Sequence, residues 1–382
     1  GSGKHNNWSL VTNDGINMLN PGDTPHENIQ FLLVLACILK AVDKHADLLR
    51  ESAACVGNEH RLGAHEAPPA IISVFLGEQL EDVIDQLCST GEATHSLQGG
   101  ILKTGVTTLP DFEKDATDRN RTSPFAFTNN KFEFRMVGSS DSIASPNIVL
   151  NTIVAESFKE AANELEKADD FDEAVHNMIK KLFINHRRII FNGNGYSDEW
   201  VKEAKRRGLS NLPSMVDAIP ALVYDSSVKL FEEFEVFTRK ELESRVEIEY
   251  EAYSKAINIE AKAMIDIAGK SIIPAVIRYT TRLADSVIKL KKAMEGIEPY
   301  AQCSILSEVN DHLKESKLAL ENLKKYMDDV SVITDVTEHA RYMHEVIVPA
   351  MEALRKPIDT LEMIVDKDLW PMPSYGDLLF EV

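Results

Sequence analysis

A glutamate and an arginine two positions apart form the most informative pattern in this sequence of 382 residues. From Asn130 to Met136 polar and apolar side chains alternate strictly, as Asn-Lys-Phe-Glu-Phe-Arg-Met. Such alternation predicts a β-strand, in which successive side chains point to opposite faces. Glu133 and Arg135 would then lie side by side with Lys131 on one face. A solvated sheet edge with paired charges would give the same pattern, so both interpretations stay open at this point.

Three other segments carry residue types that suit phosphate or metal chemistry, although each alone is weak evidence. Residues 118–124, Asp-Arg-Asn-Arg-Thr-Ser-Pro, form a polar turn whose guanidinium groups suit phosphate oxygens through forked hydrogen bonds. Residues 59–69 combine Arg, His, Gly and Glu in a predicted loop. Residues 1–9, Gly-Ser-Gly-Lys-His-Asn-Asn-Trp-Ser, are a turn of small residues followed by polar side chains.

Taken together and in this order, the four segments resemble motifs of the glutamine synthetase family. Residues 1–9 are similar to its N-G-S-G-x-H-x-x-x-S motif without the first Asn. Residues 61–68 resemble its R-L and E-A-P flap, residues 120–122 its N-R-S/T motif, and residues 133–135 its E-x-R strand. The terminal segment 369–376, Leu-Trp-Pro-Met-Pro-Ser-Tyr-Gly, resembles the large type III branch, which carries a helical carboxy-terminal extension.

This resemblance implies an ATP-dependent ligase that joins ammonia to L-glutamate and gives L-glutamine through a γ-glutamyl phosphate intermediate. Its substrates would be L-glutamate, ammonium and ATP, and its metal would be Mg²⁺ or Mn²⁺. By the same resemblance we expect a homo-oligomeric ring, a dodecamer by family. Hard divalent cations neutralise triphosphate charge and prefer carboxylate oxygens, with an occasional imidazole.

The resemblance also assigns the metal and catalytic roles. His5 and Glu133 match ligands of the metal near the nucleotide phosphates. Arg121 and Arg135 match arginines that stabilise charge on the transferring phosphoryl group. Glu66 matches the flap carboxylate that shields the acyl phosphate from water and helps to deprotonate ammonium.

Further matches concern substrate and nucleotide binding. Gly1, through its backbone, Arg61 and Arg135 match contacts to the substrate glutamate. Asn7 and Ser9, together with Arg121, match the ATP-binding positions. Two departures weaken the ATP assignments: Ala126 stands where many members have a second arginine, and Asn7 where many have a histidine. In a third departure, the flap is one residue shorter than usual between Leu62 and Glu66.

The elements that must position these residues change in character near residue 155. Before that point helical patterns alternate with turns rich in Gly and Pro; beyond it, residues 221–268 and 300–348 contain neither, as long helices require. We expect an α+β fold with a glutamine synthetase catalytic-domain sheet and flanking helices in residues 1–155. A long-helix antiparallel bundle would occupy residues 156–382 and return to the catalytic domain at its tail. A seam with steps of four and three should pack one long helix: Val309, Leu313, Ser316, Leu320, Leu323 and Met327.

Composition limits the partners. The 41 Lys and Arg against 61 Asp and Glu give a formal charge of -20, which opposes binding to nucleic acid or to anionic membranes. The most apolar run, residues 31–39, is shorter than the ~20 residues that span a bilayer. The 4 cysteines lack metal or redox spacing, which fits reduced thiols. We expect a soluble cytoplasmic protein.

Two tempting features have simpler interpretations. His339 and His344 are five residues apart and not four, so they would not share one metal on a helix. Residues 186–196 contain two arginines and an Asn-Gly-Asn-Gly-Tyr run but lack the Lys-Ser/Thr of a phosphate loop. We interpret them as a helix followed by a turn.

The family's amino-terminal β-grasp domain and the glutamates that complete both metal sites should precede residue 1. We therefore expect a piece of a longer chain that is inactive alone. A γ-glutamyl-amine ligase of the same superfamily is one alternative, although Glu66 favours ammonium. A catalytically silent assembly or regulatory module is another, although Glu133 and Arg121 are retained.

Overall fold

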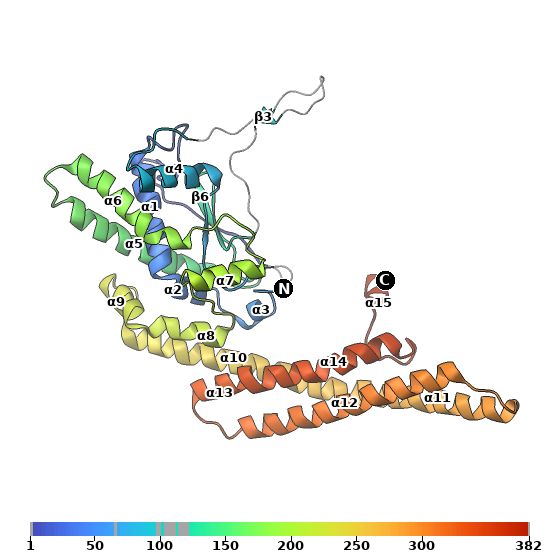
Figure 1. The fold of residues 1–382 in the computed structure, drawn as a ribbon. Helices are drawn as coiled ribbons and strands as arrows, with labels where there is room; N and C mark the ends of the chain where they lie inside the picture. Colours follow the sequence, from blue (N-terminus) through green and yellow to red (C-terminus); the bar gives the residue numbers. More distant parts are fainter. Residues whose placement is uncertain (1–2, 65–66, 97–100, 103–111, 114–121, 381–382) are drawn as a thin grey trace. The chain divides into compact units, whose positions relative to one another are not determined.

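The computed structural model describes residues 3–64, 67–96, 101–102, 112–113 and 122–380, and it divides the chain into two compact units. The first unit is Gly1–Val246 and the second is Glu247–Val382 (Figure 1). Residue 155 lies inside a helix of the first unit. The domain boundary that we expect at this residue separates a catalytic domain from its extension, and it need not coincide with the boundary between compact units. It stays a prediction.

The fold is mixed α and β, rich in helix with a small sheet, as expected. Within the described residues, no helix is both long enough and apolar enough to cross a membrane. The strands of the first unit are β1 (Asn6–Trp8), β2 (Val74–Phe75), β3 (Ile101–Leu102), β4 (Phe112–Glu113), β5 (Phe125–Thr128) and β6 (Lys131–Phe134). Its helices are α1 (Ile29–Lys44), α2 (Ala46–Glu51), α3 (Val56–Glu59), α4 (Glu78–Ser89), α5 (Ala144–Leu165), α6 (Phe171–His186), η1 (Arg187–Ile189), α7 (Asp198–Arg206), α8 (Met215–Ala218), η2 (Ile219–Val223) and α9 (Asp225–Glu233).

The sheet that carries the predicted strand has the order β1-β6-β5-β2. β5 and β6 form a tight hairpin whose turn contains Asn129 with φ of 58°, a conformation that Asn tolerates better than most residues. β1 pairs antiparallel with β6, whereas β2 pairs parallel with β5. The predicted alternation is confirmed, because Phe132, Phe134 and Met136 are buried while the charged residues between them face the other way.

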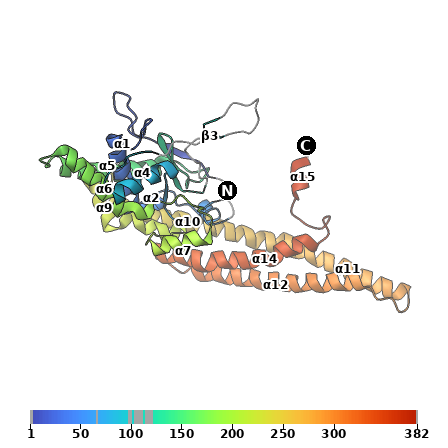
Figure 2. The same ribbon diagram turned by 45° about the horizontal axis from the view of Figure 1, so that its top comes forward.

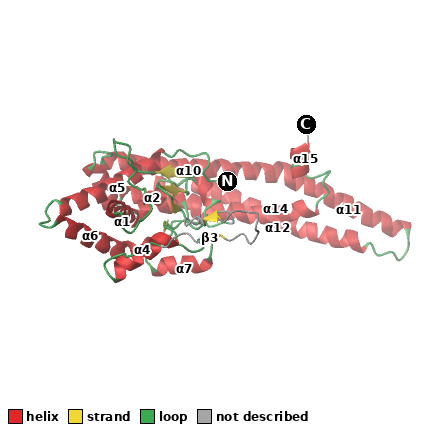
Figure 3. Cartoon of the chain, turned by 90° about the horizontal axis from the view of Figure 1, so that it is seen from above, coloured by secondary structure: helices red, strands yellow, loops and turns green. Residues whose placement is uncertain are grey.

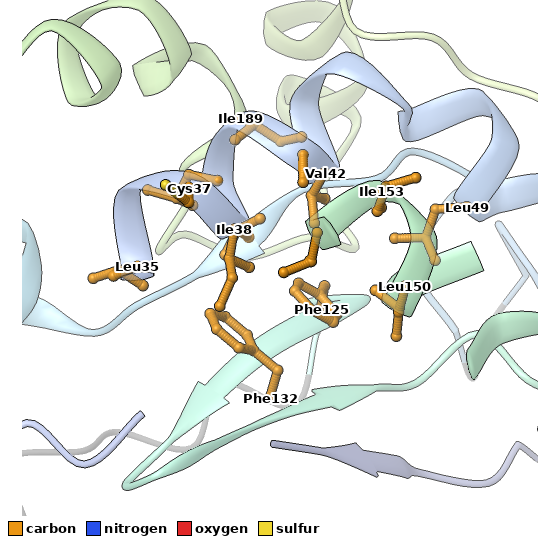
Figure 4. Close-up of a cluster of buried hydrophobic side chains, with 14 of the residues drawn as sticks. Leu35, Cys37, Ile38, Val42, Leu49, Phe125, Phe132, Leu150, Ile153 and Ile189 are labelled. Carbon is orange, nitrogen blue, oxygen red and sulfur yellow. The ribbon is translucent and has the colours of Figure 1, made fainter. Parts of the chain in front are cut away.

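The core of the first unit lies between this sheet and a layer of helices. α1, α5 and α6 pack together, and Figures 1 and 2 show them beside the sheet. Figure 4 shows Ile38 and Val42 of α1 directed toward Phe125 and Phe132 of the hairpin. The rings of Phe125 and Phe132 are stacked with centroids 4.5 Å apart. The apolar face of the hairpin therefore anchors the strands, and the opposite face is left for polar side chains.

The second unit is built from long helices that run side by side, as Figure 3 shows. α12 packs against both α11 and α14, and the predicted seam is confirmed on it. Val309, Ser316, Leu320 and Leu323 are buried, and the two other seam residues are half-buried. Helix α10 crosses from the first unit into the second. The helices are α10 (Arg239–Ile267), η3 (Ala268–Ile272), α11 (Ile273–Ala293), α12 (Tyr300–Val330), α13 (Val336–Tyr342), η4 (Met343–Ile347), α14 (Val348–Ile364) and α15 (Tyr375–Phe380).

Two of these segments, η3 and η4, are π-helical turns, and each comes immediately before a helix with proline near its start. Pro274 follows η3 and Pro349 follows η4. Proline lacks an N–H and clashes with the carbonyl of the residue four positions earlier, so a wider turn relieves the conflict without ending the helix. The prolines thus explain both π-helical turns without any ligand.

Candidate functional site

The polar face of the sheet aligns residues from three strands in one row. Asn7 of β1 and Ala126 of β5 are the cross-strand partners of Glu133, one on each side. Side chains directly opposite one another in an antiparallel pair lie on the same face. Ala126, where many family members have an arginine, is thus a buried neighbour of Glu133. Its methyl group supplies no charge there.

Glu133 is the centre of the charged cluster on this face. Its Oε2 accepts hydrogen bonds from Arg135 Nη2 at 2.9 Å and Nε at 3.2 Å, and it lies 3.3 Å from His5 Nδ1. Burial raises the pKa of Glu133, but hydrogen bonds and charge from Arg135, with smaller effects of His5 and Lys131, outweigh it. The net pKa lies below the ordinary value. The carboxylate is therefore ionised at neutral pH.

Arg61 is held rigidly beside this cluster. Its Nε donates to Asn58 Oδ1 at 3.1 Å, and its Nη2 donates to the carbonyl of Met136 at 2.6 Å. Asn58 is itself buried and donates to the same carbonyl. Burial lowers the pKa of Arg61, although an arginine in a protein keeps its charge. Gly3 lies against the guanidinium, and a Cβ at that position would overlap it.

His5, Arg61 and Arg135 line one cavity of about 160 Å³. Two further lining residues, Ser123 and Tyr196, were not singled out from the sequence as site residues. The only signal for Tyr196 was its place at the end of the Asn-Gly-Asn-Gly-Tyr run. The cavity is thus lined by two guanidinium groups, an imidazole and two hydroxyl groups, a combination that suits an anionic ligand.

The run that contains Tyr196 is a loop after α6 and η1, in agreement with the prediction of a helix followed by a turn. Thr122 fastens it, because the Gly195 N–H donates to Thr122 Oγ1 at 2.8 Å. A Cβ at Gly195 would lie 2.5 Å from the Thr122 carbonyl oxygen, so only glycine fits. At the other end Asn192 Oδ1 accepts from the N–H groups of Leu76 and Gly77.

The segment that we predict to be the flap is described at its base. Leu62 and Ala67 form a β-bridge, and the Gly63 N–H donates to the carbonyls of Ala67 and Pro68. Gly63 has φ of +78°, which favours glycine. Three predicted site residues lie outside the described residues: Gly1, Glu66 and Arg121. Their roles stay predictions.

The two predicted ATP-binding residues of the first strand lie in different surroundings. Asn7 is exposed beside Glu133, with its amide 3.5 Å from the His5 carbonyl. Ser9 is farther along, where its hydroxyl lies 2.9 Å from Asn17 Oδ1 and 3.0 Å from the Asn130 carbonyl oxygen and can donate to one of the two. Ser9 therefore has a local role at the hairpin turn, and its nucleotide contact stays a prediction.

The donor set at Glu133 fits part of a divalent metal site. A carboxylate oxygen and an imidazole nitrogen lie close together on adjoining segments, and both are ligands for such ions. In the part of the chain that the structure describes, no group of three or more His, Cys, Asp and Glu could hold a metal ion. His5 and Glu133 would thus supply two ligands, and the remaining ligands must come from elsewhere. In the second unit His344 Nδ1 is instead 3.0 Å from the Tyr253 hydroxyl.

Comparison with known proteins identifies relatives of this chain. Residues 174–291 match a family model described as the glutamine synthetase C-terminal domain. Over the whole chain the sequence is 44% identical to a type-3 glutamine synthetase of Dictyostelium discoideum, covering 52% of that protein. It is 38% identical to glutamine synthetases of Butyrivibrio fibrisolvens and Bacteroides fragilis, covering 54% of each. The chain spans about half the length of these relatives. It belongs to the glutamine synthetase family, within the type III branch.

Proposed function

We propose that this chain supplies part of the active site of a glutamate–ammonia ligase, which forms L-glutamine from L-glutamate, ammonium and ATP. The reaction would pass through γ-glutamyl phosphate. The observation that carries the proposal is the convergence of His5, Arg61 and Arg135 on one cavity, with Glu133 bound to Arg135. The names of the relatives support the same activity.

Four residues in or beside the cavity have proposed roles that their surroundings support. Arg61 would bind a carboxylate of glutamate, because its charged guanidinium lines the cavity and is oriented there by hydrogen bonds to Asn58 and to the Met136 carbonyl. Arg135 would also contact that substrate and stabilise charge on the transferring phosphoryl group. His5 and Glu133 would hold Mg²⁺ or Mn²⁺, which neutralises phosphate charge when bound.

The remaining assignments rest on the family match alone. Gly1 would contact glutamate through its backbone, Glu66 would shield the acyl phosphate and accept a proton from ammonium, and Arg121 would bind and activate ATP. Asn7 and Ser9 would bind the nucleotide. We expect residues of a longer chain to complete the metal site. We also expect the protein to form a homo-oligomeric ring in the cytoplasm. Residues 156–382 would form an antiparallel helical extension.

The decisive experiment is trapping of the acyl phosphate. The natural full-length protein and these 382 residues alone should be incubated with glutamate, hydroxylamine and Mg-ATP, and γ-glutamyl hydroxamate measured. Glu133→Gln should lower the rate by about 100-fold or more, because each tenfold corresponds to ~1.4 kcal/mol and a metal contributes several. Glu166→Gln, at an exposed helix end of the first unit, is the matched control and should be unchanged.

The outcomes separate the alternatives. Hydroxamate formation by the full-length protein that Glu133→Gln does not reduce would refute the role of Glu133. Higher rates with a primary amine such as ethylamine than with ammonium would identify a γ-glutamyl-amine ligase. No product, together with no binding of Mg-ATP at millimolar concentration, would identify a catalytically silent module.

A further inference from the structure

A cavity of about 740 Å³ lies wholly within the second unit and is lined by residues of α10, of the end of α12, and of α13 and η4. We call it the lysine cavity, because Lys255, Lys262 and Lys324 line it. Lys255 and Lys262 are seven residues apart on α10 and so share one helix face. Lys324 comes from α12. The volume of the lysine cavity is in the range of small-molecule sites, about 300–1,000 Å³.

The lysines of this cavity differ in their ion pairing. Lys255 Nζ lies 2.6 Å from Glu251 Oε2 and is neutralised. Within the described residues neither Lys262 nor Lys324 has a carboxylate in ion-pair distance. Asp328 is the other acidic residue of the lining, so three cations face two anions. A local excess of positive charge is notable in a chain with a formal charge of -20.

The other walls of the lysine cavity are apolar or neutral. Met327, Val336 and Met343 contribute apolar surface. Burial lowers the pKa of His339, so at neutral pH its imidazole is uncharged and offers one donor and one acceptor. Ser254 is buried in the lining, and its hydroxyl has no hydrogen-bond partner among the described residues. The cavity thus combines a cationic rim with an apolar interior.

We propose that the lysine cavity binds a small amphipathic anion, in which an oxyanion group is attached to an apolar body. Lys262 and Lys324 would bind the oxyanion, and the methionine and valine side chains would cover the apolar part. Small-molecule sites likewise combine apolar surface with polar groups that fix the orientation of the ligand. The proposal is independent of the ligase chemistry, because none of these residues belongs to the candidate active site.

The test uses the fluorescent dye 8-anilinonaphthalene-1-sulfonate, which is an aromatic anion. Saturable binding to the protein should weaken about two- to fivefold in Lys262→Gln and in Lys324→Gln, the range expected when one partly exposed ion pair is removed. The double variant should weaken it further. Lys325→Gln is the matched control, because Lys325 is the next residue of α12, is also exposed, and does not line the cavity. Circular dichroism should confirm that all variants are folded.

Two results would overturn the proposal. One is dye binding that is equal in the wild type, the double variant and Lys325→Gln, since the dye would then occupy other apolar surface. The other is the absence of saturable binding to the wild type. Loss of affinity confined to the Lys262 and Lys324 variants, and weakened by added salt, would support it.

Discussion

In the first unit the indole N–H of Trp8 donates to Asn151 Oδ1, across 143 positions of sequence. In the second unit Lys255 pairs with Glu251, four positions away on the same helix. The contrast is general, because the first unit joins its strands and helices through many long-range polar contacts of this kind. The second unit mostly pairs charges along single helices and relies on apolar side chains between helices.

This difference indicates how each unit can hold polar groups in a precise arrangement. The candidate active site takes His5, Arg61, Glu133 and Tyr196 from four distant segments, so it exists only when the whole first unit is folded. Pairs four residues apart on a helix form locally and add little to the stability of the fold. A site in the second unit must instead use side chains that different helices direct to one cavity.

The largest effect that tests this contrast is expected in the core of the β5–β6 hairpin. Phe132→Ala should destabilise the first unit by about 3–5 kcal/mol, because it removes a fully buried ring stacked on Phe125. Hydrogen exchange read by mass spectrometry should show the loss of protection in residues 1–246. Phe171→Ala, at a position that is 60% exposed, is the control and should have little effect. An equal loss of protection throughout residues 247–382 would contradict the separation into two units.

A smaller effect is expected at the support of Arg61. Asn58→Ala would remove a buried amide that donates to the Ala53 and Met136 carbonyls and accepts from Arg61. Unsatisfied buried partners cost about 1–3 kcal/mol, which urea denaturation should reveal. Since Arg61 would lose its positioning, KM for glutamate should rise more than kcat falls. Asn322→Ala, at an exposed position of α12, should change neither quantity.

A pH-dependent effect of about 1 kcal/mol is expected at Glu156. Burial raises its pKa, but hydrogen bonds from His45 and Lys44 outweigh this and lower it to about 2. An unfolded chain would have an ordinary pKa of about 4.3. Because the folded value is the lower one, ionised Glu156 stabilises the fold above about pH 4.3, and this contribution is lost as the pH falls toward 2. The stability difference between wild type and Glu156→Gln should therefore disappear over that range, and a constant difference would contradict it.

The smallest effect should come from a helical ion pair of the second unit. Lys317 Nζ lies 3.0 Å from Glu321 Oε1, and both side chains are more than half exposed. Lys317→Ala should change the free energy of unfolding by less than about 0.5 kcal/mol, as judged by urea denaturation. A loss above about 1 kcal/mol would show that local pairs matter more in this unit than the comparison suggests.

Regular patterns were predictable from the sequence, whereas the docking of loops was not. The strict alternation around Glu133 predicted a strand and the side-by-side placement of Glu133 and Arg135, because a period of two leaves one face for the core. The seam on α12 was predictable for the same reason. The contact of Arg61 with the Met136 carbonyl and the place of Tyr196 depend on how non-repeating loops fold over one another. Contacts between loops leave no periodic pattern of residue types in the sequence.

The position of Gly3 has one more consequence. The guanidinium beneath it is bonded to Asn58 through Nε and to the Met136 carbonyl through Nη2, so a shift to make room for a larger neighbour would strain these hydrogen bonds. A single added carbon atom at residue 3 would therefore displace either the backbone at that residue or the arginine. Glycine at position 3 therefore leaves room for the charged group of Arg61, which is 58 residues farther along the chain. A larger residue there would disturb the position of that group.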